Sequence, residues 1–566
     1  MAKSILSALA LVSAFGMTAG TAVAQPNAGS YLAARSAAGQ NDFTAASSWF
    51  SSALEDDPTN PDLIENLLAS RLATGNVDAA IPVAEAALGS GMDSQLANMV
   101  LALKAAQSND WNTIFDALEA GHSVGPLVDG LTRAWAYVGK GDMRSALDAF
   151  DEVIEAPGMR SFGLFHKALA LATVGDFEGA EAILSLEPSQ GMARNRRTLI
   201  ARAQVLSQLG QSEAAVAMLD EAVGPAPDDL TLRELRTQLE TGEPIPFSVV
   251  TGASTGLAEV YYTLASILSE ETPETYVLLY SRIAQALHPD DADIAILTAE
   301  LLDMLGAYPL ASAAYATVPQ DDPAFFEAEL GRAEVLRKDG ETALAIEVLG
   351  QLIRVYPDLP MGHITLGDAM RQSERFDEAI DAYSRAIDLM DPRDPRLWFV
   401  FYMRAIGYHR VDNWPEAEAD FRSALALNPD QPQILNYLGY SLVERREKLD
   451  EALQMIETAV DAQPQNGAII DSLGWAYFVL GRIEDAVEPM ERAAELEPVD
   501  PIVLDHLGDV LWSVGRKREA RFQWQRALSF DPEPDEATRI RRKLEVGLDQ
   551  VLTEEGVEVP STAQDL

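Results

Sequence analysis

Small and apolar residues return along this chain with a period of about 34 residues. The separations 12, 7 and 5 occur in two consecutive intervals, in Gly474, Ala486, Ala493 and Pro498 and then in Gly508, Ala520, Ala527 and Pro532. Small residues at the first two points let two antiparallel helices approach closely, and proline ends the second helix because it has no N–H for the helical hydrogen bond. Each interval is therefore predicted to be a helical hairpin.

The hairpin pattern continues towards the N-terminus. The small residue that begins each second helix, or its substitute, recurs at Ala520, Ala486, Ala452, Ala417, Ala379, Ala345, Ala311 and Val277. After a jump of 62 residues it resumes at Ala215, Ala180, Ala146, a degenerate position near Thr113, Ala80 and Ala45. The pattern predicts an all-α, right-handed α-solenoid of about 14 hairpins, in which each hairpin contacts mainly its neighbours.

The jump marks an irregular connection over 241–255, since residues 241–256 contain two prolines and three glycines. It separates a predicted N-terminal arm, 26–240, from a C-terminal arm, 256–535. The apolar residues Phe247, Val249 and Val250 are unusual for a free linker, so we expect this connection to dock against a helix face.

Beyond the last repeat, an apolar stripe at helical spacing predicts a capping helix over 536–552, which would cover the end of the solenoid. The polar residues 553–566 are predicted to form a disordered tail.

The order of residues in each interval resembles the tetratricopeptide repeat, whose helix pair carries a Leu-Gly pair, an aromatic residue, two alanines and a proline. One matching block is Leu473, Gly474, Tyr477, Ala486, Met490, Ala493 and Pro498. Another is Leu438, Gly439, Leu442, Ala452, Ile456, Ala459 and Pro464, with one residue inserted. The resemblance implies an array of tetratricopeptide-type hairpins that binds protein partners along its inner groove.

The first residues predict export. Lys3 supplies the positive charge typical of the beginning of a signal peptide, and residues 5–15 are apolar. The small residues Ala22 and Ala24 are typical of a cleavage site. Residues 1–24 are therefore predicted to be a signal peptide that is cut after Ala24. The alternative, a membrane anchor, is disfavoured because the apolar run is shorter than the ~20 residues that a spanning helix needs. We expect a periplasmic or secreted protein without a transmembrane segment.

The net charge and the cysteine content limit the classes of partner and of binding site that this chain can have. Lys and Arg number 42 and Asp and Glu 88, giving a formal net charge of −46, and the chain has no cysteine. This acidity favours solubility and basic partners and disfavours nucleic acid and anionic membranes. Without cysteine, disulfides, thiolate metal sites and a lipidated N-terminal cysteine are excluded.

Enzyme signatures are missing from the sequence. The six histidines are scattered, none forms a His-Glu-x-x-His pair, and no serine-centred motif or phosphate loop is present. We therefore predict a binding protein that is not an enzyme, with no catalytic residues, no metal site and no cofactor.

In tetratricopeptide arrays the first helix of each hairpin lines the groove, and the resemblance assigns the groove to positions three before and one, four and five after the small residue. In the C-terminal arm these positions predict a groove for a peptide or partner, formed by Tyr402, Asn436, Tyr440, Asp471, Trp475, Phe478, Asp505, Asp509 and Trp512. Amide and carboxylate oxygens can accept hydrogen bonds from an extended chain, and aromatic rings supply contact area.

Two alternatives to this groove stay open at the level of sequence. The aromatic residues can pack between hairpins while the polar residues bond locally. A cell-wall glycan or peptidoglycan is the rival ligand, since aromatic rings beside carboxylates also suit sugars.

Basic residues gather near the C-terminus although the chain is acidic. They predict a docking patch for an acidic partner, formed by Arg516, Lys517, Arg518, Arg521, Arg539, Arg541, Arg542 and Lys543. The alternative is that they neutralise nearby acidic repeats or a helix C-terminus.

The stretches 471–477 and 505–512 resemble long exported bacterial tetratricopeptide proteins of the envelope. Some members of that group are lipoprotein adaptors that deliver substrates to a carboxyl-terminal processing protease or assist envelope assembly. This chain departs from the lipidated form because it has no cysteine. The resemblance thus implies a periplasmic scaffold or adaptor for protein partners, with extended or disordered segments favoured.

Overall fold

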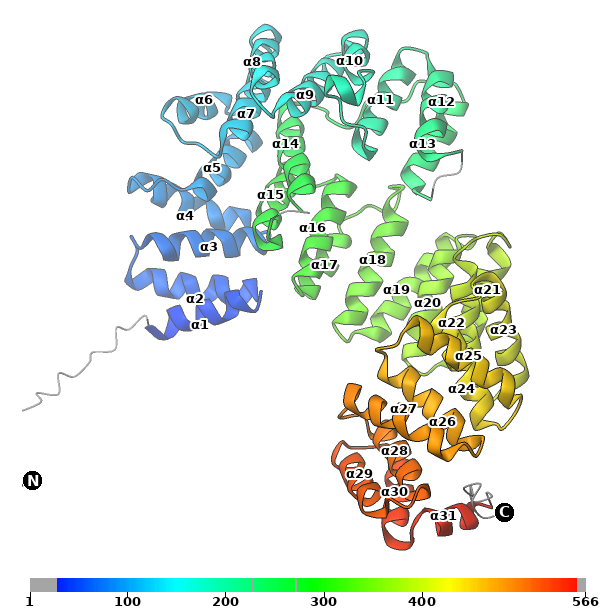
Figure 1. The fold of residues 1–566 in the computed structure, drawn as a ribbon. Helices are drawn as coiled ribbons and strands as arrows, with labels where there is room; N and C mark the ends of the chain where they lie inside the picture. Colours follow the sequence, from blue (N-terminus) through cyan, green and yellow to red (C-terminus); the bar gives the residue numbers. More distant parts are fainter. Residues whose placement is uncertain (1–27, 226–227, 270–271, 557–566) are drawn as a thin grey trace, which may run out of the picture. The chain divides into compact units, whose positions relative to one another are not determined.

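The computed structural model describes residues 28–225, 228–269 and 272–556. Within these ranges it contains 31 α-helices and one short 3-10 helix, and no strand (Figure 1). The predicted all-α solenoid is confirmed, with about fifteen helix pairs where the spacing predicted about 14. The predicted signal peptide, 1–24, lies outside the described residues, as do residues 557–566 of the predicted tail.

The chain divides into two compact units, the first ending at Glu341 and the second beginning at Thr342. The first unit contains α1 (Ala28–Gly39), α2 (Phe43–Asp56), α3 (Pro61–Ala73), α4 (Val77–Gly89), α5 (Gln95–Gln107), α6 (Trp111–Glu119), α7 (Pro126–Gly139), α8 (Met143–Glu155), α9 (Arg160–Thr173), α10 (Phe177–Leu184), α11 (Arg196–Gln208), α12 (Ser212–Val223), α13 (Leu230–Glu240), α14 (Ala253–Leu268), α15 (Glu274–Leu287), α16 (Ala292–Met304), α17 (Tyr308–Tyr315) and α18 (Phe325–Lys338).

The second unit contains α19 (Thr342–Val355), α20 (Pro360–Gln372), α21 (Phe376–Leu389), α22 (Leu397–Arg410), α23 (Trp414–Leu427), α24 (Pro432–Glu444), α25 (Leu449–Ala462), α26 (Gly467–Val479), α27 (Ile483–Leu496), α28 (Pro501–Ser513), α29 (Lys517–Ser529), α30 (Pro534–Val546) and α31 (Leu548–Glu555).

The turn between the two helices of a hairpin follows from local chemistry. Between α7 and α8, Gly141 takes a φ of 75°, a conformation that favours glycine, and Asp142 then caps α8 by accepting a hydrogen bond from the Ser145 N–H at 3.1 Å. Similar turns with a positive φ separate the two helices of most pairs, so the chain reverses direction about twice in each 34-residue period.

We call the surface formed by the first helices of consecutive hairpins the inner face of a unit. In the first unit this face is covered by the unit's own chain, because α14 packs on α5, α7 and α9, and α15 packs on α3 and α5 (Figure 1). The contact is close: a Cβ added at Gly256 would lie 2.3 Å from the Trp135 ring, and the Arg282 Nε donates to the Ala73 carbonyl at 3.1 Å.

The irregular connection docks on α11, within the first unit. Gln204 Oε1 accepts from the Ser248 N–H at 2.9 Å, Gln208 Nε2 donates to the Ile245 carbonyl at 2.6 Å, and Val249 and Val250 are buried. The sequence pattern predicted a division between two arms at 241–255, whereas the first compact unit ends at Glu341 and the second begins at Thr342. The difference arises because this docking and the packing of α14 and α15 tie 241–287 to the preceding helices.

The predicted capping helix, 536–552, is two helices in the structure, α30 and α31. Gly547 separates them with a φ of 88°, and an added Cβ there would lie 2.4 Å from the Trp512 ring. The apolar stripe nevertheless serves the expected purpose, since Ile540, Leu548 and Leu552 belong to the hydrophobic cluster at the end of the second unit.

Candidate functional site

The predicted groove residues lie on the first helices of four consecutive hairpins in the second unit. Tyr402 is on α22, Asn436 and Tyr440 are on α24, Asp471, Trp475 and Phe478 are on α26, and Asp505, Asp509 and Trp512 are on α28. Residues at equivalent positions of these helices share one side of the unit because the hairpins repeat. The surroundings of these residues differ between the α22–α24 end of the row and its α28 end.

At the α28 end, the carboxylates have partners within the chain. Lys543 of α30 is fully buried and donates to Asp505 Oδ2 at 2.7 Å and to Asp509 Oδ2 at 2.6 Å. Asp509 Oδ1 also accepts from Trp524 Nε1 at 2.9 Å. Burial raises the pKa of Asp509, although Lys543 and Arg539 oppose this rise. These carboxylates therefore hold α30, whereas the sequence suggested that they would face a ligand. Asp505 Oδ1 is buried and has no hydrogen-bond partner among the described residues.

Trp512 also belongs to this internal packing. Its ring is 5.3 Å from that of Trp524, and its Nε1 donates to Asp549 Oδ2 of α31 at 3.1 Å. With 8% of its surface exposed, Trp512 offers little area to a partner.

On α26, the rings of Trp475 and Phe478 stack together, and His506 of α28 stacks on Trp475. Trp475 lies 4.0 Å from His506 and 4.9 Å from Phe478 between ring centroids, and its Nε1 donates to Glu444 Oε1. Asp471 Oδ2 lies 2.9 Å from His506 Nδ1. Burial by itself lowers the pKa of His506, but the Asp471 carboxylate more than offsets this and leaves it above its usual value. Trp475 alone among the three predicted α26 residues is only partly buried.

At the α22–α24 end of the row, the predicted residues have no ion pair or hydrogen bond to α30 or α31 among the described contacts. Tyr402 and Tyr440 are partly buried, and burial raises the pKa of both phenols. Between them in the row lies Asn436, whose Oδ1 is buried and has no hydrogen-bond partner in the described part of the chain. A buried carbonyl oxygen without a donor is energetically costly, which makes Asn436 unusual among the predicted residues of α22 and α24.

Two exposed apolar residues on the first helices α20 and α22 were not among the residues predicted from the sequence. Met361 on α20 is 38% exposed and Phe399 on α22 is 36% exposed. Each lies six residues before the small residue of its helix, Gly367 or Ala405, so the same repeat phase could have found them.

The predicted basic patch is largely engaged within the chain. Three of its arginines form ion pairs: Arg516 with Glu519 and Glu491, Arg539 with Glu555, Asp505 and Asp509, and Arg542 with Glu554 and Glu545. Arg521 donates a hydrogen bond to the Leu544 carbonyl, and Lys517 lies over the Trp512 ring. Lys543 is buried. Arg518 and Arg541 are exposed. Lys543 cannot contact an outside partner because its side chain has no exposed surface.

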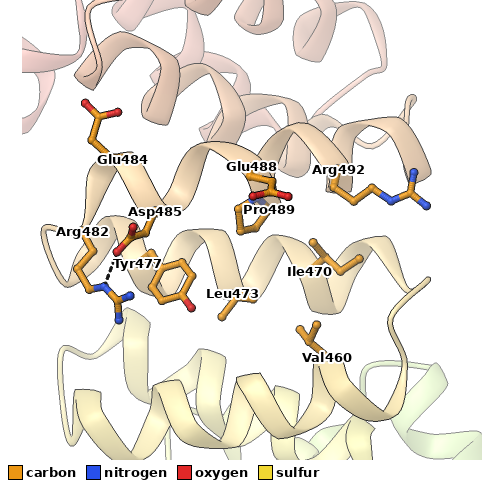
Figure 2. A pocket seen from close by; sticks show the side chains of 10 residues that line it. All are labelled: Val460, Ile470, Leu473, Tyr477, Arg482, Glu484, Asp485, Glu488, Pro489 and Arg492. Carbon is orange, nitrogen blue, oxygen red and sulfur yellow. Dashed lines mark hydrogen bonds and ion pairs between the residues drawn. The ribbon is translucent and has the colours of Figure 1, made fainter.

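A second hollow lies between α25, α26 and α27 and has a volume of about 510 Å³ (Figure 2). Tyr477 and Leu473 line it from α26, and α27 contributes charges of both signs. Several of its polar groups already have partners: Arg482 Nε donates to Asp485 Oδ2 at 2.8 Å and stacks 4.3 Å from the Tyr477 ring centroid. This hollow has no equivalent of the unpaired Asn436 oxygen among the residues that line it.

The described ranges show neither a metal-binding cluster nor a helix that could span a membrane. No group of three or more His, Asp or Glu residues there is placed to hold a metal ion. None of the helices in those ranges is both long and apolar enough to cross a bilayer.

Comparison with known proteins agrees with the fold. A curated tetratricopeptide-repeat-containing protein of Pseudomonas aeruginosa is 28% identical over 28% of this chain, and human tetratricopeptide repeat protein 13 is 27% identical over 35%. The chain spans about a quarter of the length of these two relatives, 26% and 23%.

Among solved structures, a chain of the APC/C hetero-tetramer Cut9–Hcn1 aligns with a TM-score of 0.38 at 16% identity, covering 92% of this chain and 96% of that one. A tetratricopeptide repeat protein from Parabacteroides merdae aligns with a TM-score of 0.37 at 15% identity, covering 45% of this chain and 97% of that one.

Family models of the tetratricopeptide repeat match residues 31–95, 196–221, 330–395, 402–467 and 472–535, which together make up about half of the sequence. The hairpins, their close-packed small residues and these matches agree, and the chain belongs to the tetratricopeptide repeat family.

Proposed function

We propose that this protein is a scaffold that binds a protein partner through an extended segment laid along the inner face of α22, α24 and α26. The observation that carries the proposal is Asn436, whose buried Oδ1 has no donor among the described residues and lies in a row with the partly buried rings of Tyr402 and Tyr440. An extended peptide supplies main-chain N–H groups for the amide oxygen and side chains for the aromatic surface.

The second unit is the better candidate for this binding because the inner face of the first unit is already covered. There α14, α15 and the docked connection contact the first helices that would otherwise receive a ligand. In the second unit, the corresponding intrachain cover comes from α30, whose Lys543 and Arg539 contact α28.

The net charge of −46 favours a basic partner segment, since oppositely charged surfaces attract during encounter. We further propose that the protein acts outside the cytoplasm, as an adaptor for an envelope protease or an assembly machinery. The support for this step is the signal-peptide pattern in 1–24 and the resemblance to exported tetratricopeptide proteins.

Glycan binding is the weaker alternative. Trp475, the aromatic residue most suited to a sugar face, is stacked on His506 with an interplanar angle of 13°, and its Nε1 is held by Glu444. One face of the indole is therefore already covered.

The proposal is tested by affinity capture from an envelope extract, with the full-length protein as bait. The variant Asn436→Ala with Tyr440→Ala is expected to recover at least about tenfold less partner, because truncating a central anchor of an interface costs about 1–3 kcal/mol. The captured protein is identified by mass spectrometry, and its affinity for parent and variant is then measured by titration.

The matched control is Tyr477→Ala, which removes an aromatic ring from α26 in the hollow of Figure 2 and leaves the inner face intact. Unchanged recovery by the double variant would reject the inner face. Loss of the partner with Tyr477→Ala alone would move the site to that hollow, and sedimentation with purified cell wall would support a glycan ligand.

A further inference from the structure

The hairpin of α5 and α6 departs from the regular repeat. Its second helix, α6, has only nine residues, and the sequence pattern is degenerate near Thr113. A cavity of about 340 Å³ occupies this place, lined by α4, α5, α6, the segment 120–124, α7 and α14. All of these elements belong to the first unit, so the cavity is separate from the proposed protein-binding face of the second.

Most of the cavity wall is apolar. Leu101, Ala102 and Ala105 line it from α5, and Ile114 and Leu118 line it from α6. Such a wall favours the apolar body of a small molecule, because moving apolar surface out of water is favourable.

Three lining side chains carry a polar atom without a partner. Asn98 Oδ1, Thr132 Oγ1 and Tyr261 OH are each buried, and none has a hydrogen-bond partner among the described residues. The side chains are 6%, 5% and 0% exposed. An unsatisfied buried polar group costs about 1–3 kcal/mol, so three on one cavity wall are unusual for a site that only packs.

The charged groups at the cavity disfavour an anion. Asp116 and Asp129 both line it, and no Lys or Arg does. Asp129 is engaged with its own loop, since its carboxylate accepts from the Val124 N–H at 2.9 Å and from the Ser123 hydroxyl. One N–H of the Asn98 amide donates to the Ser123 carbonyl at 3.0 Å, whereas the Asn98 Oδ1 has no partner among the described residues.

We propose that this cavity binds a small uncharged molecule with an apolar body and a hydroxyl head. A hydroxyl donates one hydrogen bond and accepts others, so it can donate to Asn98 Oδ1 and accept from the hydroxyl of Tyr261 or Thr132. The volume is at the lower end of the range of about 300–1,000 Å³ that small-molecule sites occupy, which sets the size of the ligand.

The test uses saturation-transfer NMR with the full-length protein and three probes that share a phenyl ring: benzyl alcohol, toluene and benzoate. Benzyl alcohol is expected to bind, toluene to bind more weakly and benzoate not to bind. Tyr261→Phe, which removes the hydroxyl and keeps the ring, is expected to weaken benzyl alcohol about tenfold, as the loss of one buried hydrogen bond would. Ala102→Phe, which fills the cavity, is expected to abolish binding.

The matched control is Tyr315→Phe, a second buried tyrosine of the first unit that does not line the cavity. It should leave benzyl alcohol binding unchanged. Equal binding of the three probes, or benzyl alcohol binding that survives both Tyr261→Phe and Thr132→Val, would overturn the proposal. Absence of binding to the folded parent protein would show that the cavity holds only water and would overturn it as well.

Discussion

His166 is a buried titratable group in the middle of the first unit. Its side chain lies in α9, and its Nδ1 accepts a hydrogen bond from Trp135 Nε1 at 3.2 Å. The residue has no exposed surface, and burial lowers its pKa to about 3. The imidazole is therefore neutral in the folded protein at every pH above about 3.

This depressed pKa predicts acid sensitivity. In the unfolded chain the histidine binds a proton below its usual pKa of about 6.5, whereas in the folded chain it does not, so acid favours unfolding as the pH falls below 6.5. Between pH 7 and pH 5 the parent protein should lose about 2 kcal/mol more local stability than His166→Gln. Hydrogen exchange of the α9 amides at the two pH values measures this difference.

The control for this experiment is His506, whose pKa is raised by Asp471. A raised pKa has the opposite effect on stability. The protonated histidine stabilises the folded protein below pH 6.5, and this stabilisation is lost as the pH rises through the pKa that His506 has in the folded protein. Protection of α28 should therefore fall towards alkaline pH. Equal pH dependence of parent and His166→Gln in α9 would contradict the assignment of His166 as the acid-sensitive group.

At the scale of the helical element, a glycine sets how closely the two helices of a hairpin approach. A Cβ at Gly508 would lie 2.3 Å from the Trp524 indole, and a Cβ at Gly474 would lie 2.7 Å from Met490 Cγ. Trp524 is fully buried, and its Nε1 is held by Asp509, so its ring has little freedom to move. Met490 is flexible and can adopt another rotamer.

These two glycines should therefore respond differently to alanine. Gly508→Ala is expected to destabilise the second unit by about 2–3 kcal/mol through overpacking, and Gly474→Ala by about 1 kcal/mol or less. Urea unfolding followed by circular dichroism measures both changes. Gly29→Ala, where no atom lies within 4 Å of the added Cβ, is the control and should be neutral or slightly stabilising. Equal losses of unfolding free energy in Gly508→Ala and Gly474→Ala would contradict the expected difference between the held Trp524 ring and the flexible Met490 side chain.

At the scale of the whole molecule, the docked connection predicts resistance to proteolysis. Gln204 and Gln208 hold its backbone, and Val249 and Val250 are buried. Thermolysin, which cleaves before apolar residues, should cut before Val249 or Val250 at least about tenfold more slowly in the parent than in Gln204→Ala with Gln208→Ala, because each lost hydrogen bond is worth about 1 kcal/mol.

Mass spectrometry of the fragments locates the cut. Gln211→Ala, in the turn between α11 and α12 and outside this contact, serves as the control. Rapid cleavage of the parent at Val249 or Val250 would show that the connection is not docked in solution.

The sequence was informative where structure is local and repetitive. The spacing of Gly474 and Ala486 predicted a hairpin that the structure confirms, because two small residues at this distance are what close helix packing needs. It was silent where distant segments meet. No periodicity in the sequence predicts the contact of Lys543 with Asp505 and Asp509, or the packing of α14 on α7. Such contacts depend on the three-dimensional path of the whole unit, which the repeat spacing does not determine.

The candidate site shows the same limit. Repeat phase placed Tyr402, Asn436 and Tyr440 on neighbouring first helices, but it could not tell which members of the row are covered by α30. It also missed the cavity, although the weak repeat near Thr113 marked the irregular hairpin beside it.

The self-covered inner face of the first unit also affects the order of events during synthesis. The hydrogen bond from Arg282 to Ala73 joins residues 209 positions apart, and that from Asn41 to Leu305 joins residues 264 apart. Simple repeat arrays can fold by adding one hairpin at a time to a growing stack, whereas long loops must close before contacts such as these form. The first helices to leave the ribosome thus wait for roughly half the polypeptide before their exposed apolar surface is protected, and a chaperone has its main opportunity in that interval.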